Sequence, residues 1–225
     1  MKNIKMKELK LITSLHKSTK RKYLKRMINQ KVNCMKIAKK YSFDYWDGDR
    51  KYGYGGYKYI EGRWQKVAQK LIKIYKLNNK SNILDIGCGK GFLLYEIKKI
   101  LPEIKITGID ISSYGIKNSK KEIKKYLFKK DLRKPLKYKS NIFDLVFSIN
   151  TLHNLEIDHL ISVIKNIQKI GKKHYICVES YKNEEELFNL QCWALTCESF
   201  FSKREWIWLL KNSGYAGDYE FIYFN

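Results

Sequence analysis

The chain has 225 residues, which is enough for one domain with an extension and a full hydrophobic core. Its formal net charge is +24, but only six of its 46 basic residues are arginines, the residue that nucleic-acid surfaces favour. Lysine, isoleucine, asparagine and tyrosine are abundant together, as an AT-rich genome would impose on any surface. We therefore favour dispersed lysines over a dedicated RNA-binding face as the interpretation of this charge, and a small molecule over nucleic acid as the partner.

The sequence also bears on the cellular compartment in which we expect the protein. No apolar run approaches the roughly 18 residues of a membrane span, and the lysine-rich start lacks the apolar core of a signal peptide. The cysteines are odd in number, form no Cys-x-x-Cys pair and lie near no histidine cluster: Cys34, Cys88, Cys177, Cys192 and Cys197. We expect free or buried thiols in a reducing cytoplasm, and no metal site.

The first forty residues carry fourteen basic side chains against one acid, Glu8. Four apolar residues recur at helical spacing after a potential cap at Ser18 or Thr19, namely Leu24, Ile28, Val32 and Met35. We predict a basic helical arm over residues 1–40 that lays this stripe on the main domain. The arm is either a docked, solvated helix or a lid over a ligand site, and in the second case His16 would enter that site.

The stretch from Tyr45 to Trp64 interleaves five glycines with tyrosines and tryptophans. Glycine weakens regular structure, and rings so closely spaced cannot all face a core. We predict a loop over residues 41–64 whose backbone approaches a ligand and whose rings, Tyr54 and Tyr57 among them, wall it in. Arg63, with Arg50, could clamp an anionic group bidentately. The alternative is a loop that only packs on the surface.

Residues 82–91 predict a buried parallel strand, a glycine turn and a helix start, an arrangement typical of a nucleotide-type site at the carboxyl end of a sheet. Gly87, Gly89 and Gly91 follow Gly-x-Gly-x-Gly spacing, whereas a dinucleotide site has Gly-x-Gly-x-x-Gly. Asp85 would repel a pyrophosphate but suits a ligand with positive charge. A second strand, 104–109, ends in Asp110, where a carboxylate would accept hydrogen bonds from ribose hydroxyls. An NAD enzyme would also have Asp110, and a mere tight turn stays an alternative.

Further elements follow along the chain. We predict helices over 64–77, 112–125 and 187–197, and another behind a capping box at Ser202–Glu205. Strands are expected at 126–128, 142–149, 175–178 and 219–224. Two side chains at strand ends could remove a proton. His153 is the first candidate because its ordinary pKa of about 6.5 suits neutral pH, and Glu179 is the second.

The run Leu84-Asp85-Ile86-Gly87-Cys88-Gly89-Lys90-Gly91 resembles the first motif of class I S-adenosylmethionine-dependent methyltransferases. The resemblance implies an α/β, Rossmann-like, seven-stranded and mostly parallel sheet with helices on both faces, over residues 41–225. It also implies S-adenosylmethionine as cofactor and S-adenosylhomocysteine as product. In such a site the methionine end would lie at Asp85, Gly87, Cys88 and Gly89, the ribose at Asp110 and Ile111, and the adenine at Asp131 and Leu132, with Asn150 near the methyl.

Residues 45–64 also resemble an N-terminal stretch of bacterial methyltransferases of surface-polysaccharide and nucleotide-sugar pathways. That resemblance implies a small, anionic acceptor in capsule biosynthesis, such as a nucleotide-linked sugar or a phosphoramidate precursor, methylated on O or N and bound by Tyr54, Tyr57, Arg63 and His16. The chain lacks the Asn-Pro-Pro-Tyr, Asp-Pro-Pro-Tyr and Pro-Cys motifs of nucleic-acid base methylation. An RNA methyltransferase using the basic arm and a non-catalytic cofactor-binding module stay open as alternatives, as does a homodimer.

Overall fold

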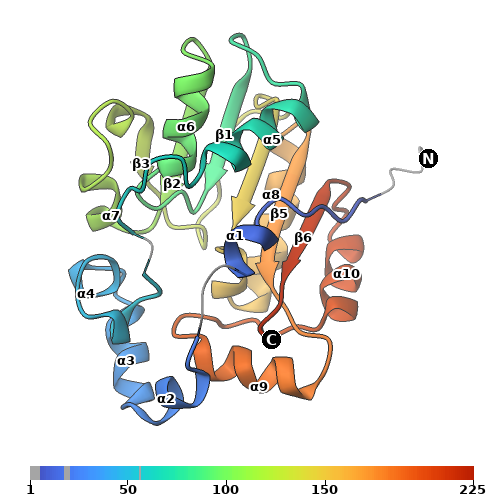
Figure 1. Ribbon diagram of the computed structural model, residues 1–225. Coiled ribbons are helices and arrows are strands. Elements are labelled where there is room, and N and C mark those ends of the chain that lie inside the picture. The colour runs from blue at the N-terminus through green and yellow to red at the C-terminus, as the bar shows by residue number, and fades with distance from the viewer. Residues whose placement is uncertain (1–5, 18–20, 56) are drawn as a thin grey trace.

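A six-stranded sheet in the order β3-β2-β1-β4-β5-β6 forms the centre of the computed structural model, which describes residues 6–17, 21–55 and 57–225. Every neighbouring pair of these strands runs parallel. Their bounds are β1 Asn82–Ile86, β2 Lys105–Asp110, β3 Leu127–Lys129, β4 Leu145–Ile149, β5 His174–Glu179 and β6 Asp218–Ile222. The result is a Rossmann-like α/β fold (Figure 1).

The predicted seventh strand is wrong for the described part of the chain. The final predicted strand is β6, and it pairs directly with β5 along its whole length, from Tyr175 opposite Asp218 to Glu179 opposite Ile222. The outer edge of β6 meets the N-terminal segment instead, where Leu9 N–H donates to the Tyr219 carbonyl at 2.8 Å. The prediction of seven strands came from the family resemblance. At the edge of β6, a single bridge between Glu8 and Tyr219 stands where a seventh strand would pair.

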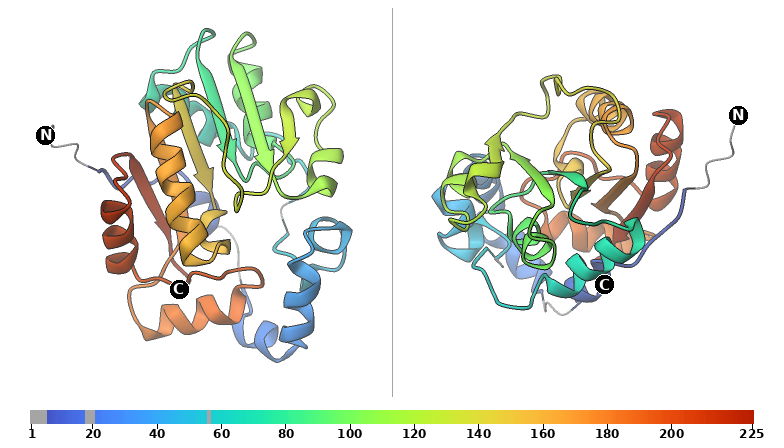
Figure 2. Two further views of the ribbon diagram at one scale, coloured as in Figure 1. Left: turned by 180° about the vertical axis from the view of Figure 1, so that it is seen from behind. Right: turned by 90° about the horizontal axis from the view of Figure 1, so that it is seen from above.

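Helices cover both faces of the sheet (Figure 2). One face carries α5 Gln65–Tyr75 and α6 Phe92–Ile100, and the other carries α8 Ile157–Ile170 and α10 Lys203–Asn212. The predicted capping box of Ser202 and Glu205 begins α10. Within the described residues, no helix is both long and apolar enough to cross a membrane.

Two helices differ from the sequence predictions. The helix expected over 112–125 is limited to α7 Ser113–Lys117, followed by the 3-10 turn η2 Lys124–Tyr126. Ser119 Oγ and Asn118 Nδ2 donate to carbonyls one turn back, which competes with helix continuation. No prediction covered α8, although its face of Leu160, Val163, Ile164, Ile167 and Ile170 forms much of one core.

A cap of short helices lies across the carboxyl ends of the strands, beside α9 Glu184–Trp193 (Figure 1). We define the cap as residues 21–55, with α2 Tyr23–Ile28, α3 Lys31–Ala38, α4 Phe43–Trp46 and the 3-10 turn η1 Arg50–Tyr52. The potential helix cap at Ser18 or Thr19 lies outside the described residues.

The predicted docking of the arm's apolar stripe is wrong for three of its four residues, whereas the fourth, Met35, is partly buried against the main domain. Leu24, Ile28 and Val32 are 60%, 75% and 66% exposed. The chain breaks between α2 and α3, where Gln30 has φ 48°, so the stripe does not continue along one helix. The opposite side faces inward, and there Cys34 and Ala38 pack against Leu195.

The segment before the cap is fixed by a buried carboxylate. Glu220 of β6, 1% exposed, accepts hydrogen bonds from the backbone N–H groups of Leu11, Ile12 and Thr13 at 2.5 to 2.9 Å. Tyr175 donates its hydroxyl to the same carboxylate at 2.7 Å. These bonds hold the start of α1 Thr13–Lys17 beside β6.

Candidate active site

A cavity of about 500 Å³ lies between the carboxyl ends of the strands and the cap. Its wall contains every residue that the sequence predicted for the site except Arg50, so the fold brings together positions from 16 to 179. Their individual roles remain predictions. The residues are His16, Tyr54, Tyr57, Arg63, Asp85, Gly87, Cys88, Gly89, Asp110, Ile111, Asp131, Leu132, Asn150, His153 and Glu179.

Asp85, at the end of β1, presents a buried carboxyl group to this cavity. It is 5% exposed, and burial together with the charge of Asp110 raises its pKa well above the ordinary value. Among the residues that the structure describes, none donates a hydrogen bond to it. A buried carboxylate needs a partner to stay charged, so a ligand ammonium group would complete this position.

Asp110, at the end of β2, is held in a fixed orientation by the backbone. One carboxylate oxygen accepts from Gly89 N–H at 2.9 Å and the other from Ser112 N–H at 2.7 Å. Burial raises the pKa of Asp110, and these backbone donors oppose the rise. Each oxygen retains a lone pair, which two vicinal hydroxyls could use.

The first two glycines of the loop allow side chains to approach closely. Gly87 has φ +80° and Gly89 φ +56°, a left-handed conformation that favours glycine. A Cβ at Gly87 would lie 2.0 Å from Thr151 Oγ1, and one at Gly89 would lie 2.7 Å from the Trp46 ring. Side chains therefore fill the space on the Cβ side of these two glycines, and both glycines also line the cavity.

Asp131 is already paired within the chain. Arg133 donates Nε and Nη2 to its two carboxylate oxygens at 2.9 and 2.7 Å, and this contact lowers the pKa of Asp131. Leu132 lies beside it on the cavity wall. A contact of Asp131 with adenine would use the lone pairs that Arg133 leaves.

His153 is buried, and its surroundings contradict the pKa on which its selection as a base depended. Burial lowers that pKa to about 3. Nδ1 accepts the backbone N–H of Glu179 at 3.3 Å, so the ring proton is on Nε2, which lies 3.5 Å from Glu179 Oε2. His153 is thus a neutral imidazole whose acceptor nitrogen is already engaged.

Burial shifts the pKa of Glu179, the second candidate base, toward neutral pH and not away from it. Its side chain is 12% exposed, and it lies on the cavity wall at the end of β5. Burial raises its pKa to about 7, against the opposing charges of Arg21 and Arg26. A carboxyl group that titrates near neutral pH in a cavity is suited to taking up a proton.

Of the residues predicted to bind the substrate, Tyr54 and His16 already have hydrogen-bond partners within the chain, whereas Arg63 has no ion-pair partner among the described residues. Tyr54 OH accepts backbone N–H groups from Leu195 and Thr196 at 2.6 and 3.1 Å, so its hydroxyl fixes the chain after α9. His16 Nδ1 accepts from Arg21, and Nε2 donates to the Tyr223 carbonyl. Arg63 makes no ion pair within the described part of the chain, so its guanidinium remains available to a ligand.

The arginines concentrate at this site more strongly than the sequence led us to expect. Arg21, Arg63 and Arg133 line the cavity, and Arg26 and Arg50 lie over the Trp193 ring at 4.2 and 6.0 Å from its centroid. Five of the six arginines therefore gather at one place in a lysine-rich chain. Because arginine is rare in this chain, the positions of its few arginines could have indicated the site from the sequence alone.

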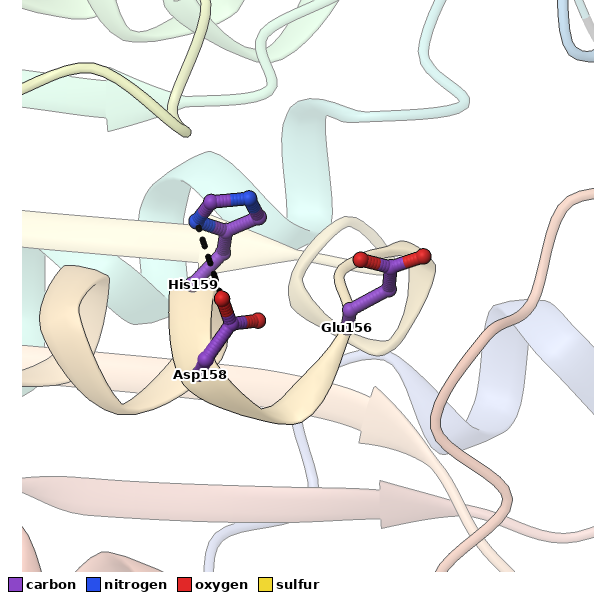
Figure 3. A group of neighbouring side chains, drawn as sticks. All are labelled: Glu156, Asp158 and His159. Atoms are coloured by element: carbon purple, nitrogen blue, oxygen red, sulfur yellow. Dashed lines mark ion pairs between the residues drawn. The ribbon is translucent and has the colours of Figure 1, made fainter.

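A group of possible metal ligands lies outside the cavity wall. Glu156 precedes α8 at its N-cap position without a side-chain capping bond, and Asp158 and His159 lie in the first turn of the helix (Figure 3). Asp158 and His159 form a long ion-pair contact of 3.8 Å, with side chains 69% and 34% exposed. Exposed acidic groups of this kind occur without ligands, and we assign no site to them.

Comparison with known proteins identifies the class. Residues 77–214 match the family described as a methyltransferase domain. The chain belongs to this family. Ribosomal RNA small subunit methyltransferase C of Buchnera aphidicola is 31% identical over 110 residues, which is 45% of this chain and 33% of that protein. Malonyl-[acyl-carrier protein] O-methyltransferase of Legionella pneumophila is 33% identical over 75 residues, or 32% of this chain and 26% of that protein. The chain thus spans a third or less of these curated relatives.

Solved structures agree on the fold. A methyltransferase structure from Bacillus halodurans has a TM-score of 0.53 at 16% identity, covering 65% of this chain and 68% of that one. Geranyl diphosphate C-methyltransferase from Streptomyces coelicolor, in a complex with S-adenosyl-L-homocysteine, has a TM-score of 0.52 at 11% identity, covering 64% and 55%. The predicted class, an S-adenosylmethionine-dependent methyltransferase, is confirmed by the family match. The acceptor is not, because these relatives are named for unlike substrates.

Proposed function

We propose that this methyltransferase moves a methyl group from S-adenosylmethionine to an oxygen or nitrogen of a small, negatively charged acceptor. In this proposal Glu179 removes the acceptor's proton. One observation carries it: a single cavity joins the carboxylates that end β1 and β2 to a buried carboxyl that ends β5. The first two suit a cationic adenosine derivative, and the third suits proton removal.

The residues present fit the cofactor. Asp85 offers an unpartnered carboxylate for an ammonium group, and Asp110 offers two oriented oxygens for ribose. The rings of Trp46 and Tyr57, 4.6 Å apart on the cavity wall, would attract a sulfonium by cation–π interaction, worth roughly 0.5–2 kcal/mol. When bound, the cofactor supplies a methyl group on positively charged sulfur. Cys88, Ile111, Asp131, Leu132 and Asn150 would complete its contacts.

Glu179 and His153 would act as a unit at the acceptor. Glu179 would receive the proton from the acceptor O–H or N–H as that atom gains the methyl group. His153, with its proton on Nε2, faces the Glu179 carboxylate and would orient it. General-base catalysis contributes about 10²–10⁴-fold and alignment of the reactants roughly 7–11 kcal/mol, so we expect alignment within the cavity to provide the larger share.

The arginines favour an acceptor with a phosphate or carboxylate group, because the guanidinium fork matches such groups. Arg63, which lines the cavity as Tyr57 does, would bind it. Residues 1–40 would form an arm that walls the acceptor side through Ile12, Leu15 and His16, and residues 41–225 the methyltransferase domain. A nucleotide-linked sugar or phosphoramidate precursor of a surface glycan, made in the cytoplasm, has the required charge.

RNA methylation is the second candidate. Residues 9–43 contain eleven basic and no acidic side chains, and the Buchnera relative is named for ribosomal RNA. If RNA were the acceptor, binding should weaken steeply with salt because phosphate contacts release counterions. A small acceptor bound mainly by Arg63 would show a shallow dependence.

Calorimetry with S-adenosylhomocysteine tests the cofactor site first, and no measurable binding by the intact protein would reject the proposal. The acceptor can then be sought by incubating the protein and S-adenosylmethionine with nucleotide sugars and phosphorylated metabolites, followed by mass spectrometry. We expect a product heavier by one methylene group, formed by the wild type and not by Glu179→Gln. Methylation of RNA alone would favour the second candidate.

A further inference from the structure

An ion pair joins the cap to the cofactor loop. Lys90 Nζ lies 2.7 and 2.8 Å from the two carboxylate oxygens of Asp47, and the Tyr114 hydroxyl donates to the same carboxylate at 2.8 Å. Lys90 belongs to the glycine loop after β1, Asp47 to the cap, and Tyr114 to α7 after β2. The Lys90 side chain is 7% exposed and that of Asp47 22%. We call these three residues the cap anchor.

Burial of this pair is costly, because two charges lose water and their attraction only offsets that loss. A buried pair is therefore weak evidence for stability, and its best-attested use is to specify one arrangement over others. Here that arrangement is the position of the cap relative to two loops. Each of these segments follows a strand whose end carries a carboxylate assigned above to the cofactor, Asp85 in β1 and Asp110 in β2.

Trp46, next to Asp47, is the side chain that the cap anchor places. Its Nε1 donates to Ser112 Oγ at 2.7 Å and to the Tyr41 carbonyl at 3.2 Å. Its ring lies so close to Gly89 and Gly115 that a Cβ on either would be 2.7 or 3.0 Å from it. The ring thus covers the glycine loop, and its polar edge bonds the residue whose N–H orients Asp110.

We propose that Lys90, Asp47 and Tyr114 are positioning residues that hold the Trp46 ring against the bound cofactor and slow its release. The proposal depends on the cofactor site proposed above. Trp46 lies on the cavity wall together with Asp85 and Asp110, so a ligand between those carboxylates lies under the cap. Its release requires this part of the cap to move, and the cap anchor opposes that movement.

Stopped-flow fluorescence with S-adenosylhomocysteine tests the proposal through the dissociation rate. We expect Asp47→Asn to raise this rate about tenfold or more, because a charge-assisted contact is lost. Tyr114→Phe keeps the ion pair and should raise the rate about two- to tenfold. Asp144→Asn is the matched control, because it breaks an ion pair with Lys172 that lies off the cavity wall, and its rate should equal that of the wild type.

The size of the change in tryptophan fluorescence on binding S-adenosylhomocysteine gives a second readout. The change should persist in Trp208→Phe, whose ring is 63% exposed on α10, and be smaller in Trp46→Phe, in which Trp64 and Trp193 remain on the cavity wall. If the wild type binds no S-adenosylhomocysteine, the proposed function and this inference both fail. If the wild type binds and both Asp47→Asn and Tyr114→Phe release the ligand at the wild-type rate, only the inference is overturned. Should Asp47→Asn not fold, Tyr114→Phe decides.

Discussion

Glu179→Gln should make the protein more stable at alkaline pH while impairing catalysis. Burial raises the pKa of Glu179 from 4.5 to about 7, so the folded protein holds this proton more tightly than the unfolded chain. Stability is therefore lost as pH rises from 4.5 to 7. At about 1.4 kcal/mol per pKa unit, the full loss is about 3 kcal/mol. Glutamine has no charge to desolvate and escapes this loss.

Urea unfolding of both proteins at pH 4.5 and pH 8 measures this difference. The free energy of unfolding of Glu179→Gln, relative to wild type, should rise by about 3 kcal/mol between the two values. Glu205→Gln is the control, because its exposed capping carboxylate has a lowered pKa and should give a slope of opposite sign. A relative stability of Glu179→Gln that is the same at both pH values would refute the desolvation argument. Turnover at pH 7.5 should fall by about 10²–10⁴-fold.

Three further predictions follow from the same site. Burial lowers the pKa of His153 to about 3, so its own contribution to the free energy of unfolding should fall by about 2 kcal/mol from pH 7 to 5, as the unfolded chain takes up a proton. Glu179 gains stability over the same range, so the measurement is the free energy of unfolding of wild type relative to His153→Asn in urea, and this difference should fall by that amount. Asp110→Ala should weaken S-adenosylhomocysteine binding about tenfold or more in calorimetry, with Asp144→Ala unchanged. Gly87→Ala should lower thermal stability more than Gly214→Ala. Both glycines have positive φ, but only at Gly87 does a side chain already lie where the Cβ would be. Gly214→Ala should lower the free energy of unfolding by about 1–2 kcal/mol.

The central sheet was largely predictable because each strand is a local pattern. The run at β1 and the alternation at β6 are visible in a few residues, and both strands form close to their predicted bounds. The number of strands cannot be read from such local patterns, because it depends on which distant segment pairs with the edge strand of the sheet. There the N-terminal segment lies beside β6, held by Glu220, and contacts across more than 200 residues leave no local signature.

The positions of the site residues were also predictable, whereas their electrostatics were not. Carboxyl ends of parallel strands share one edge, so Asp85, Asp110 and Glu179 had to converge once their strands were known. The pKa of His153 depends on what covers it. Its carbonyl accepts N–H groups from Glu198 and Ser199, so a segment some 45 residues later buries it. Sequence spacing contains no measure of that desolvation.

The reversed arm shows why an apolar stripe can mislead. Pattern analysis assumes that apolar side chains face inward, and here Leu24 and Ile28 face solvent while Arg26 is turned inward. The Arg26 guanidinium lies 4.2 Å from the Trp193 ring centroid and 5.3 Å from that of Tyr54, and it donates to the Gly53 carbonyl at 2.7 Å. Because a planar cation packs well between aromatic faces, arginine forms part of this core. The inner side of the cap therefore carries a cation that packs against the rings of Trp193 and Tyr54, two residues of the cavity wall.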